Sequence, residues 1–156
     1  MFQDADNQLF MPTVLEDVAF GLRTMGIDAG AAKRKAETAL ESVGLSSAAQ
    51  RAPYHLSAGE KKRAAIAGVL AMEPEILVLD EPTTFLDPSA QRSLARLLTD
   101  LPQAKLLVTH NIPFASAICN RAVFFQQGRI VADSTIQVIT REFGWEFETK
   151  PNKPGV

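Results

Sequence analysis

Apolar residues recur along the chain with two periods, one typical of helices and one typical of short strands. The helical period predicts helices over residues 14–24, 30–43, 58–72, 88–100, 113–119 and 135–142. Residues 76–80 and 105–109 instead contain short continuous apolar runs, which favour parallel strands buried on both faces. Two more short strands, 122–125 and 129–132, are predicted to pair around a turn at Gln127-Gly128.

This order of elements predicts an α/β fold in which helices flank a largely parallel sheet. Both predicted parallel strands end in polar residues, Asp80-Glu81 in the first and Thr109-His110 in the second. Ligands of open α/β sheets bind beyond the carboxyl ends of the strands. The sequence therefore predicts one sheet edge at which two carboxylates, a threonine and a histidine lie together.

Composition narrows the class of protein and of partner. The chain has 156 residues, which suggests one domain, and a formal net charge of −2, which gives no basic surface for a nucleic acid. Its one cysteine, Cys119, excludes an internal disulfide, and the apolar residues around it favour a buried thiol. One cysteine and two histidines are too few for a structural zinc site of the usual four-ligand kind.

The sequence carries no signal for membrane insertion or secretion. No uncharged apolar run approaches the ~18 residues of a membrane span. The acidic start of the chain lacks the basic and apolar segments of a signal peptide. We therefore expect an intracellular protein whose membrane contact, if it has any, passes through a partner protein.

The acidic pair after the first strand is the strongest candidate for chemistry. One carboxylate there can hold Mg²⁺ directly or through water, and the other can orient or deprotonate an attacking water. The alternative is a strand that ends in a solvated acidic turn. His110, beyond the second strand, is either a hydrogen-bonded structural residue or a donor to a transferring phosphoryl group.

Two predicted helix starts carry further polar candidates. Ser57-Ala58-Gly59-Glu60 has the capping-box pattern, and its free N–H groups, hydroxyl and small glycine can bind a phosphate. A plain capped helix is the alternative. Asp87, before Pro88, suits a helix cap, and Lys61-Lys62-Arg63 is by default a solvated helix face.

The order of these segments resembles the ABC ATPase family. That family's Q-loop, signature motif, Walker B strand, D-loop and H-loop correspond, in order, to Gln3, Leu56-Ser57-Ala58-Gly59-Glu60, the strand ending in Asp80-Glu81, Asp87 and His110. The signature precedes the strand by about twenty residues, and His110 lies about thirty beyond Glu81. The resemblance covers residues 1–133. Within it, residues 2–10, 13–21 and 61–71 look like the ATPase of cobalt/nickel and energy-coupling-factor vitamin importers.

This resemblance implies a partial P-loop NTPase fold, with a mostly parallel sheet flanked by helices and a helical subdomain. Residues 1–72 would form the Q-loop and the helical subdomain that meets the membrane protein. Residues 73–148 would form the C-terminal part of the RecA-like ATPase core, and residues 149–156 are predicted to be a disordered tail. The implied partners are a second ABC ATPase subunit in a head-to-tail dimer and an integral membrane transporter subunit, and the implied location is the cytoplasmic face of the cell membrane.

The resemblance also implies ATP and Mg²⁺ as cofactors and assigns roles to single residues. Gln3 would touch Mg²⁺ and the attacking water, and Asp80 would support Mg²⁺. Glu81 would be the catalytic base, and His110 would contact the γ-phosphate.

The signature region would instead act on ATP bound to the opposing subunit. Ser57 and Gly59 would hold its γ-phosphate, with Ala58 and Glu60 beside them, and Asp87 would cross the dimer interface. Ala58 and Glu60 depart from the common Leu-Ser-Gly-Gly-Gln. The added methyl restricts backbone approach, and an acid repels a phosphate unless its charge is occupied, as a capping box would do. Neither change alone argues for inactivity.

The family's phosphate-binding loop, G-x-x-x-x-G-K-[ST], has no counterpart in the sequence. Gly21 and Gly26 have the glycine spacing, but Ile27-Asp28 follow in place of the lysine and the hydroxyl residue. Without the loop, Glu81 has no phosphate positioned for it to act on. We therefore expect the chain alone to be unable to bind ATP. We also expect exposed strand edges and apolar faces to make the fold marginally stable, unless the chain self-associates or a partner covers them.

Three functions fit this sequence. The first is the C-terminal portion of an ATPase subunit that couples ATP hydrolysis to import of a metal ion or vitamin. The second is a degenerate regulatory half-site, a binding module that donates its signature motif to a complete ATPase partner. The third is a soluble, non-transport ABC protein that acts on chromosomes or ribosomes. The importer-like Q-loop region and the lack of a basic patch argue against the third.

Overall fold

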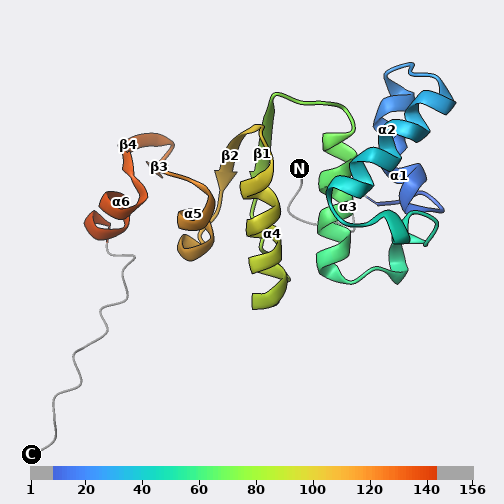
Figure 1. Cartoon of the computed structure of the whole chain (residues 1–156). Helices are drawn as coiled ribbons and strands as arrows, with labels where there is room; N and C mark the ends of the chain where they lie inside the picture. The colour runs from blue at the N-terminus through green and yellow to red at the C-terminus, as the bar shows by residue number, and fades with distance from the viewer. Residues whose placement is uncertain (1–8, 144–156) are drawn as a thin grey trace, which may run out of the picture.

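The computed structural model describes residues 9–143 (Figure 1). The predictions for Gln3 and for the tail 149–156 fall outside the described residues. A helical group, α1–α3, lies at one end of the molecule, strands β1 and β2 with helix α4 occupy the middle, and α5, a β-hairpin and α6 lie at the other end. None of the helices between residues 9 and 143 combines the length and the hydropathy that a membrane span requires.

The helical group consists of α1 (Val14–Thr24), α2 (Ala29–Ser42) and α3 (Ala58–Leu70), with two short 3-10 turns, η2 (Ser46–Ala48) and η3 (Pro53–His55), before α3. The three predicted helices are thus confirmed to within two residues at each end. A capping box between Thr13 and Glu16 starts α1, and the apolar face of this helix is buried against α2 and α3. This packing fixes the position of α3 and therefore of the residues at its N-terminus.

Strands β1 (Ile76–Asp80) and β2 (Ala104–Val108) pair in parallel, with Asp80 opposite Val108 at their carboxyl ends. Helix α4 (Pro88–Asp100), which matches its predicted bounds, connects them, and α5 (Ile112–Ile118) follows β2. Leu79 belongs to the same buried cluster as Leu94 and Leu98 of α4 and Phe114 of α5. The two helices therefore cover one face of the pair of strands.

The other face of this pair is bare, which corrects the prediction of strands buried on both faces. Leu77 and Leu79 are each 2% exposed, but Ile76 and Val78, which point the other way, are 59% and 50% exposed. Leu106 and Val108 of β2 are equally open. An apolar run predicts a strand that can be buried on both faces, but the elements that would cover the second face belong to other segments. Within residues 9–143 no element packs on this side.

The expected largely parallel sheet is reduced to these two strands. The second sheet, β3 (Arg121–Gln126) and β4 (Arg129–Thr135), is an antiparallel hairpin followed by α6 (Ile136–Glu142). Its turn lies at Gln127 and Gly128 as predicted, and both residues have positive φ, 50° and 74°. The predicted hairpin is confirmed, and each strand extends beyond its expected range.

A cleft of about 650 Å³ separates β2 from the hairpin. Its walls are β2, α5, β3 and α6, with mainly apolar side chains such as Leu107, Phe124 and Ile139. Cys119 also lines it and is half-buried, and burial raises the pKa of its thiol. The described strands therefore leave one edge of β2 unpaired, as expected for a partial sheet.

Candidate functional site

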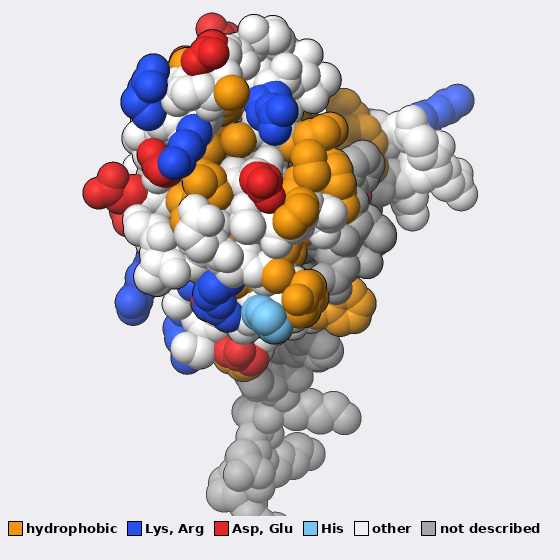
Figure 2. All heavy atoms as spheres, turned by 90° about the vertical axis from the view of Figure 1, so that its right-hand side faces the viewer, with side chains coloured by type: hydrophobic (Ala, Val, Ile, Leu, Met, Phe, Trp, Pro, Cys, Tyr) orange, Lys and Arg blue, Asp and Glu red, His pale blue; other side chains and the backbone are white. Residues whose placement is uncertain are grey.

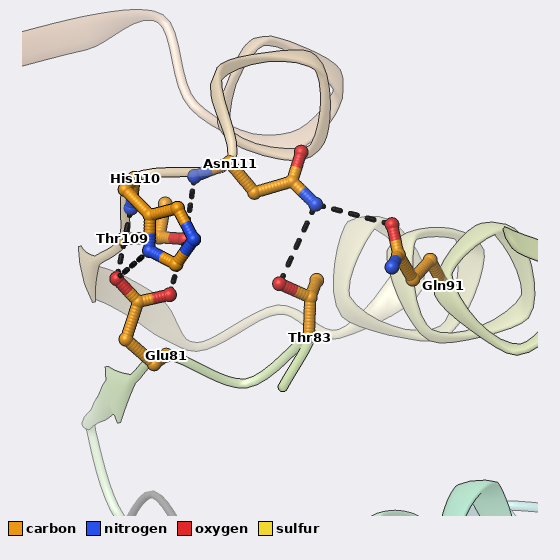
Figure 3. A network of polar contacts seen from close by, with 6 residues as sticks. All are labelled: Glu81, Thr83, Gln91, Thr109, His110 and Asn111. Atoms are coloured by element: carbon orange, nitrogen blue, oxygen red, sulfur yellow. Dashed lines mark hydrogen bonds and ion pairs between the residues drawn. The ribbon is translucent and has the colours of Figure 1, made fainter. Parts of the chain in front are cut away.

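Glu81 lies one residue beyond β1 and turns its side chain toward the end of β2 (Figure 3). Its backbone N–H donates to the Val108 carbonyl at 2.8 Å, which fixes its position at the sheet edge. The Thr109 hydroxyl donates to Glu81 Oε2 at 3.0 Å, and the His110 backbone N–H donates to Oε1 at 2.9 Å. The ring atom Nδ1 of His110 lies 2.7 Å from the same Oε1. The sheet edge predicted from the sequence thus brings Glu81, Thr109 and His110 together.

These contacts set the charge of the carboxyl group. Burial raises the pKa of Glu81, but the hydrogen bonds from His110 and Thr109 outweigh it, so the pKa lies below its ordinary value. Glu81 is therefore ionised at neutral pH and acts as an acceptor. Its side chain is 17% exposed, whereas that of His110 is 82% exposed, so the carboxylate is largely buried and the ring beside it is open to solvent.

Asn111 links this edge to the turn after β1 and to α4 (Figure 3). Its Nδ2 donates to Thr83 Oγ1 at 3.4 Å and to Gln91 Oε1 at 3.1 Å, while its Oδ1 caps α5 by accepting from the Phe114 N–H. Sequence reasoning missed the roles of Thr83, Gln91 and Asn111. Asn111 before Ile112-Pro113 carries a cap signal, but nothing in the sequence indicates the contacts that reach across to α4.

Asp80 is exposed at the end of β1 and takes no part in the hydrogen bonds around Glu81. Across residues 9–143, no three His, Cys, Asp or Glu side chains cluster closely enough to hold a metal ion. Carboxylate oxygens at a strand end nevertheless suit Mg²⁺, which proteins commonly hold through one or two carboxylates together with phosphates and water. The donor chemistry of Asp80 therefore fits the expected metal.

The segment that follows Gln3 is anchored to α1 by a buried acid. Asp17, 9% exposed, accepts from the backbone N–H groups of Phe10 and Met11 through Oδ1 at 2.9 and 3.0 Å. Burial raises the pKa of this carboxyl, and its Oδ2 has no hydrogen-bond partner among residues 9–143. Asp17 therefore fixes the path of the chain that leads out of the predicted Q-loop.

The capping box at the start of α3 is present as predicted. Ser57 Oγ accepts from the Glu60 N–H at 3.3 Å, and the Ser57 N–H donates to Glu60 Oε2 at 2.8 Å. The hydrogen bonds from Ser57, together with the charge of Arg51, lower the pKa of Glu60, so this acid is ionised. Its charge is occupied, as the sequence analysis required of an acid at this position.

A cavity of about 310 Å³ opens between the start of α3 and the turn before α4. Ser57, Gly59 and Asp87 line it, and Asp87 caps α4 by accepting from the Ser89 and Ala90 N–H groups at 2.7 and 3.0 Å. These two hydrogen bonds lower the pKa of Asp87. The cap interpretation of Asp87 is confirmed.

The two groups of candidates are separate within this chain. None of the residues around Glu81 and His110 lines the cavity at Ser57. Hydrogen bonds join the groups through Gln91, a partner of Asn111. Its Nε2 donates to the Leu86 carbonyl at 2.9 Å and its backbone N–H donates to the Asp87 carbonyl at 3.0 Å, and both Leu86 and Asp87 line the cavity.

The prediction of a solvated basic face at Lys61-Lys62-Arg63 is wrong for Lys62, which is 3% exposed. Arg63 is half-buried and donates through Nη1 to the Val43 carbonyl at 3.2 Å. Three consecutive helical residues spread over about 200° of the helix circumference. On a helix such as α3, which packs against α1, α2 and α4, they cannot all face solvent.

Comparisons with known proteins all point to the same family. A family model described as "ABC transporter" matches residues 1–84. A putative ABC transporter ATP-binding protein of Gloeobacter violaceus is 53% identical over 135 residues, which are 85% of this chain and 55% of the relative. The energy-coupling factor transporter ATP-binding protein EcfA of Methanothermobacter thermautotrophicus is 44% identical over 145 residues, 91% of this chain and 47% of the relative.

A solved structure matches as well. CbiO1 from Clostridium perfringens, described as part of the ABC transporter complex cbiONQ, superposes with a TM-score of 0.80 at 35% identity. The match covers 91% of this chain and 58% of that chain. The chain spans about half the length of the curated relatives it matches.

Proposed function

The chain belongs to the ABC transporter family, and from this premise we propose that it is the portion of an energy-coupling-factor-type ATPase subunit that carries the catalytic base and the signature motif. It hydrolyses ATP, to drive import of a metal ion or vitamin, when a phosphate-binding loop that residues 1–156 lack is supplied with it. The observation that carries this proposal is the contact of Glu81 with His110 at the adjoining ends of β1 and β2.

In the proposed reaction, Glu81 takes the proton of an attacking water. An ionised carboxylate has about four acceptor positions, two on each oxygen. The backbone N–H and Nδ1 of His110 use two positions on Oε1, and the Thr109 hydroxyl uses one on Oε2. Oε2 therefore retains one position for a water, while the two neighbours keep the carboxylate from turning away.

His110 serves this base in two ways. Its Nδ1 contact supports the ionised form of Glu81. Its exposed ring is also within reach of a phosphate group that approaches the sheet edge. Asp80 and Gln3 would hold Mg²⁺, which would balance the negative charge of the phosphate groups.

The proposed membrane partner docks on the helical end of the molecule. Figure 2 shows hydrophobic side chains gathered in patches on this face, with charged side chains among and beside them. Phe10, Met25 and Tyr54 are 63%, 64% and 76% exposed, and Phe10 packs edge-to-face on Phe20. A groove of about 290 Å³ runs past Phe10, Pro53 and Tyr54. Exposed apolar surface of this kind is typical of a protein interface and supports a location on the cytoplasmic side of a membrane transporter.

The test supplies the missing loop in trans. The chain is co-produced with the P-loop-bearing part of the Gloeobacter relative, and ATP hydrolysis by the purified assembly is measured. We expect no hydrolysis by the chain alone and a measurable rate from the assembly, which Glu81→Gln reduces by at least ~10²-fold. Hydrolysis by the chain alone, or a rate that survives Glu81→Gln, would contradict the proposal.

A second candidate function is the half-site, favoured by the exposed cavity that Ser57 and Gly59 line. In that function the chain donates its signature to the ATP of a complete partner. The discriminating assay mixes the chain with EcfA whose own signature serine has been substituted, and measures restored hydrolysis. A half-site needs Ser57 but not Glu81, whereas the first function needs Glu81.

A further inference from the structure

Arg51 lies where three segments meet just ahead of the signature helix. Its carbonyl accepts from the Val14 N–H at the start of α1 at 3.0 Å, and its own N–H donates to the Ala48 carbonyl at 2.9 Å. Its guanidinium donates through Nη1 to Glu60 Oε1 at 3.1 Å and through Nη2 to the His55 carbonyl. One side chain thus ties the η3 turn to the first turn of α3.

Glu60, the acid that Arg51 contacts, lies where a negative charge affects the binding of an anion. Glu60 is in the first turn of α3, and its other oxygen is held by the Ser57 N–H. A helix N-terminus attracts an anion through its free N–H groups and dipole. A carboxylate fixed in that turn repels a second anion unless a cation balances it.

The ion pair is sheltered more on the acid side than on the base side. The Glu60 side chain is 23% exposed and that of Arg51 is 43% exposed. Both oxygens of Glu60 are engaged, Oε1 by Arg51 and Oε2 by Ser57. The acid therefore cannot swing out into solvent without losing both contacts, and its charge stays beside the entrance of α3.

We propose that Arg51 is a positioning residue that neutralises Glu60, so that the entrance of α3 at Ser57 accepts a phosphate although an acid stands in its first turn. This inference rests on the proposed role of Ser57 and Gly59 in holding phosphate. Glu60 keeps the capping box closed, and Arg51 balances the charge that the box brings with it.

A merely structural role for Arg51 is the competing explanation, because its Nη2 also holds the η3 turn through the His55 carbonyl. The two roles separate in the background of Glu60→Gln. Glutamine keeps the capping box but removes the charge. If Arg51 neutralises Glu60, it becomes dispensable in that background; if it only holds the turn, its loss costs the same in both.

The test is a titration of the full chain with inorganic triphosphate, followed by the amide NMR shifts of residues 57–60. We expect Arg51→Ala to weaken binding by roughly two- to fivefold, as one like charge in a first helical turn does. Arg51→Lys, which keeps the positive charge, should bind close to the unchanged chain. Glu60→Gln combined with Arg51→Ala should bind at least as well as the unchanged chain. Far-UV circular dichroism verifies that each variant is folded.

Equal weakening by Arg51→Ala in the Glu60 and Gln backgrounds would overturn the inference, and so would unchanged binding by Arg51→Ala. Failure of the proposed function has a different signature. It appears as absent hydrolysis in the co-production and EcfA assays while the triphosphate titration still follows the Arg51 and Glu60 pattern.

Discussion

Nδ1 of His110 lies 2.7 Å from Oε1 of Glu81, across the carboxyl ends of two adjacent parallel strands. The contact depends on the backbone of Glu81, whose φ of 41° is unusual for a residue with a side chain. This conformation ends β1 abruptly and turns the carboxylate toward β2. Unusual backbone angles of this kind are found at functional sites, because the surrounding contacts hold them in place.

His110→Ala should reduce ATP hydrolysis by the assembly of this chain with the P-loop-bearing part of the Gloeobacter relative. The expected loss is roughly 10²-fold, the effect of removing one hydrogen-bond donor to a developing charge. Glu81→Gln should be at least as severe, because it removes the proposed base itself. Steady-state hydrolysis measured across ATP concentrations checks both. Ser116→Ala, on the exposed side of α5, is a matched control and should change the rate by less than about twofold.

Stability should decline in acid, and the sign follows from the pKa directions. Burial raises the pKa of Glu81, but the hydrogen bonds from His110 and Thr109 lower it by more than burial raises it. The folded-state pKa therefore lies below the ordinary 4.5. The stability that this carboxylate contributes is present above pH 4.5 and is lost as the pH falls through the folded value. Glu60 and Asp87 act in the same direction, whereas Asp17, whose pKa is raised by burial, acts in the opposite one.

Urea unfolding between pH 3 and pH 7 measures this dependence. In Glu81→Gln the slope of the free energy of unfolding against pH should be smaller below pH 4.5 than in the unchanged chain. An identical slope in both proteins would show that the hydrogen bonds of Glu81 do not lower its pKa.

Two neighbours on β1 should differ strongly in how much their substitution destabilises the fold. Leu77→Ala removes a side chain that is 2% exposed and should cost about 2–5 kcal/mol of unfolding free energy. Val78→Thr alters a side chain that is 50% exposed and should stay within ~0.5 kcal/mol. Val78→Thr combined with Leu106→Lys should also lessen self-association through the bare face, as measured by analytical ultracentrifugation. A face that is covered in solution would make the Val78 variant costly instead.

Local signals in the sequence were enough for most elements. Asp87 before Pro88 placed the start of α4, Ser57 and Glu60 placed the start of α3, and Gln127-Gly128 placed the hairpin turn, because each signal acts within a few residues. The sheet edge at Glu81 and His110 also followed, since parallel strands end on one side.

What the sequence could not supply were features set by neighbouring segments. The burial of Lys62 depends on which sides of α3 are packed. The bare side of Val78 depends on a layer that residues 9–143 do not provide. The contacts of Asn111 with Thr83 and Gln91 join residues far apart in the chain, and no local pattern encodes them.

Gly59 should tolerate enlargement poorly because α4 lies close to it. A Cβ on Gly59 would lie 3.3 Å from the Ala90 Cβ, whereas Ala58 is exposed. Gly59→Val should therefore cost about 1–3 kcal/mol through overpacking and should narrow the cavity at Ser57. Ala58→Val, the matched control one residue away, should cost less than about 1 kcal/mol, mainly through helix propensity. Thermal unfolding compares the two, and equal costs would show that α3 and α4 separate freely.

Tyr54 should contribute to membrane-subunit binding and little to folding. Its side chain is 76% exposed and lines the groove beside Phe10, so Tyr54→Ala removes apolar contact area from the proposed interface without opening the core. Co-purification with a cobalt- or vitamin-importer membrane subunit should fall at least tenfold, the effect of losing an aromatic anchor of about 1.4 kcal/mol or more. Phe85→Ala is the matched control, because Phe85 is 83% exposed but lies at the Ser57 cavity. Loss of binding by the Phe85 variant and not by the Tyr54 variant would move the membrane contact to the opposite side of α3.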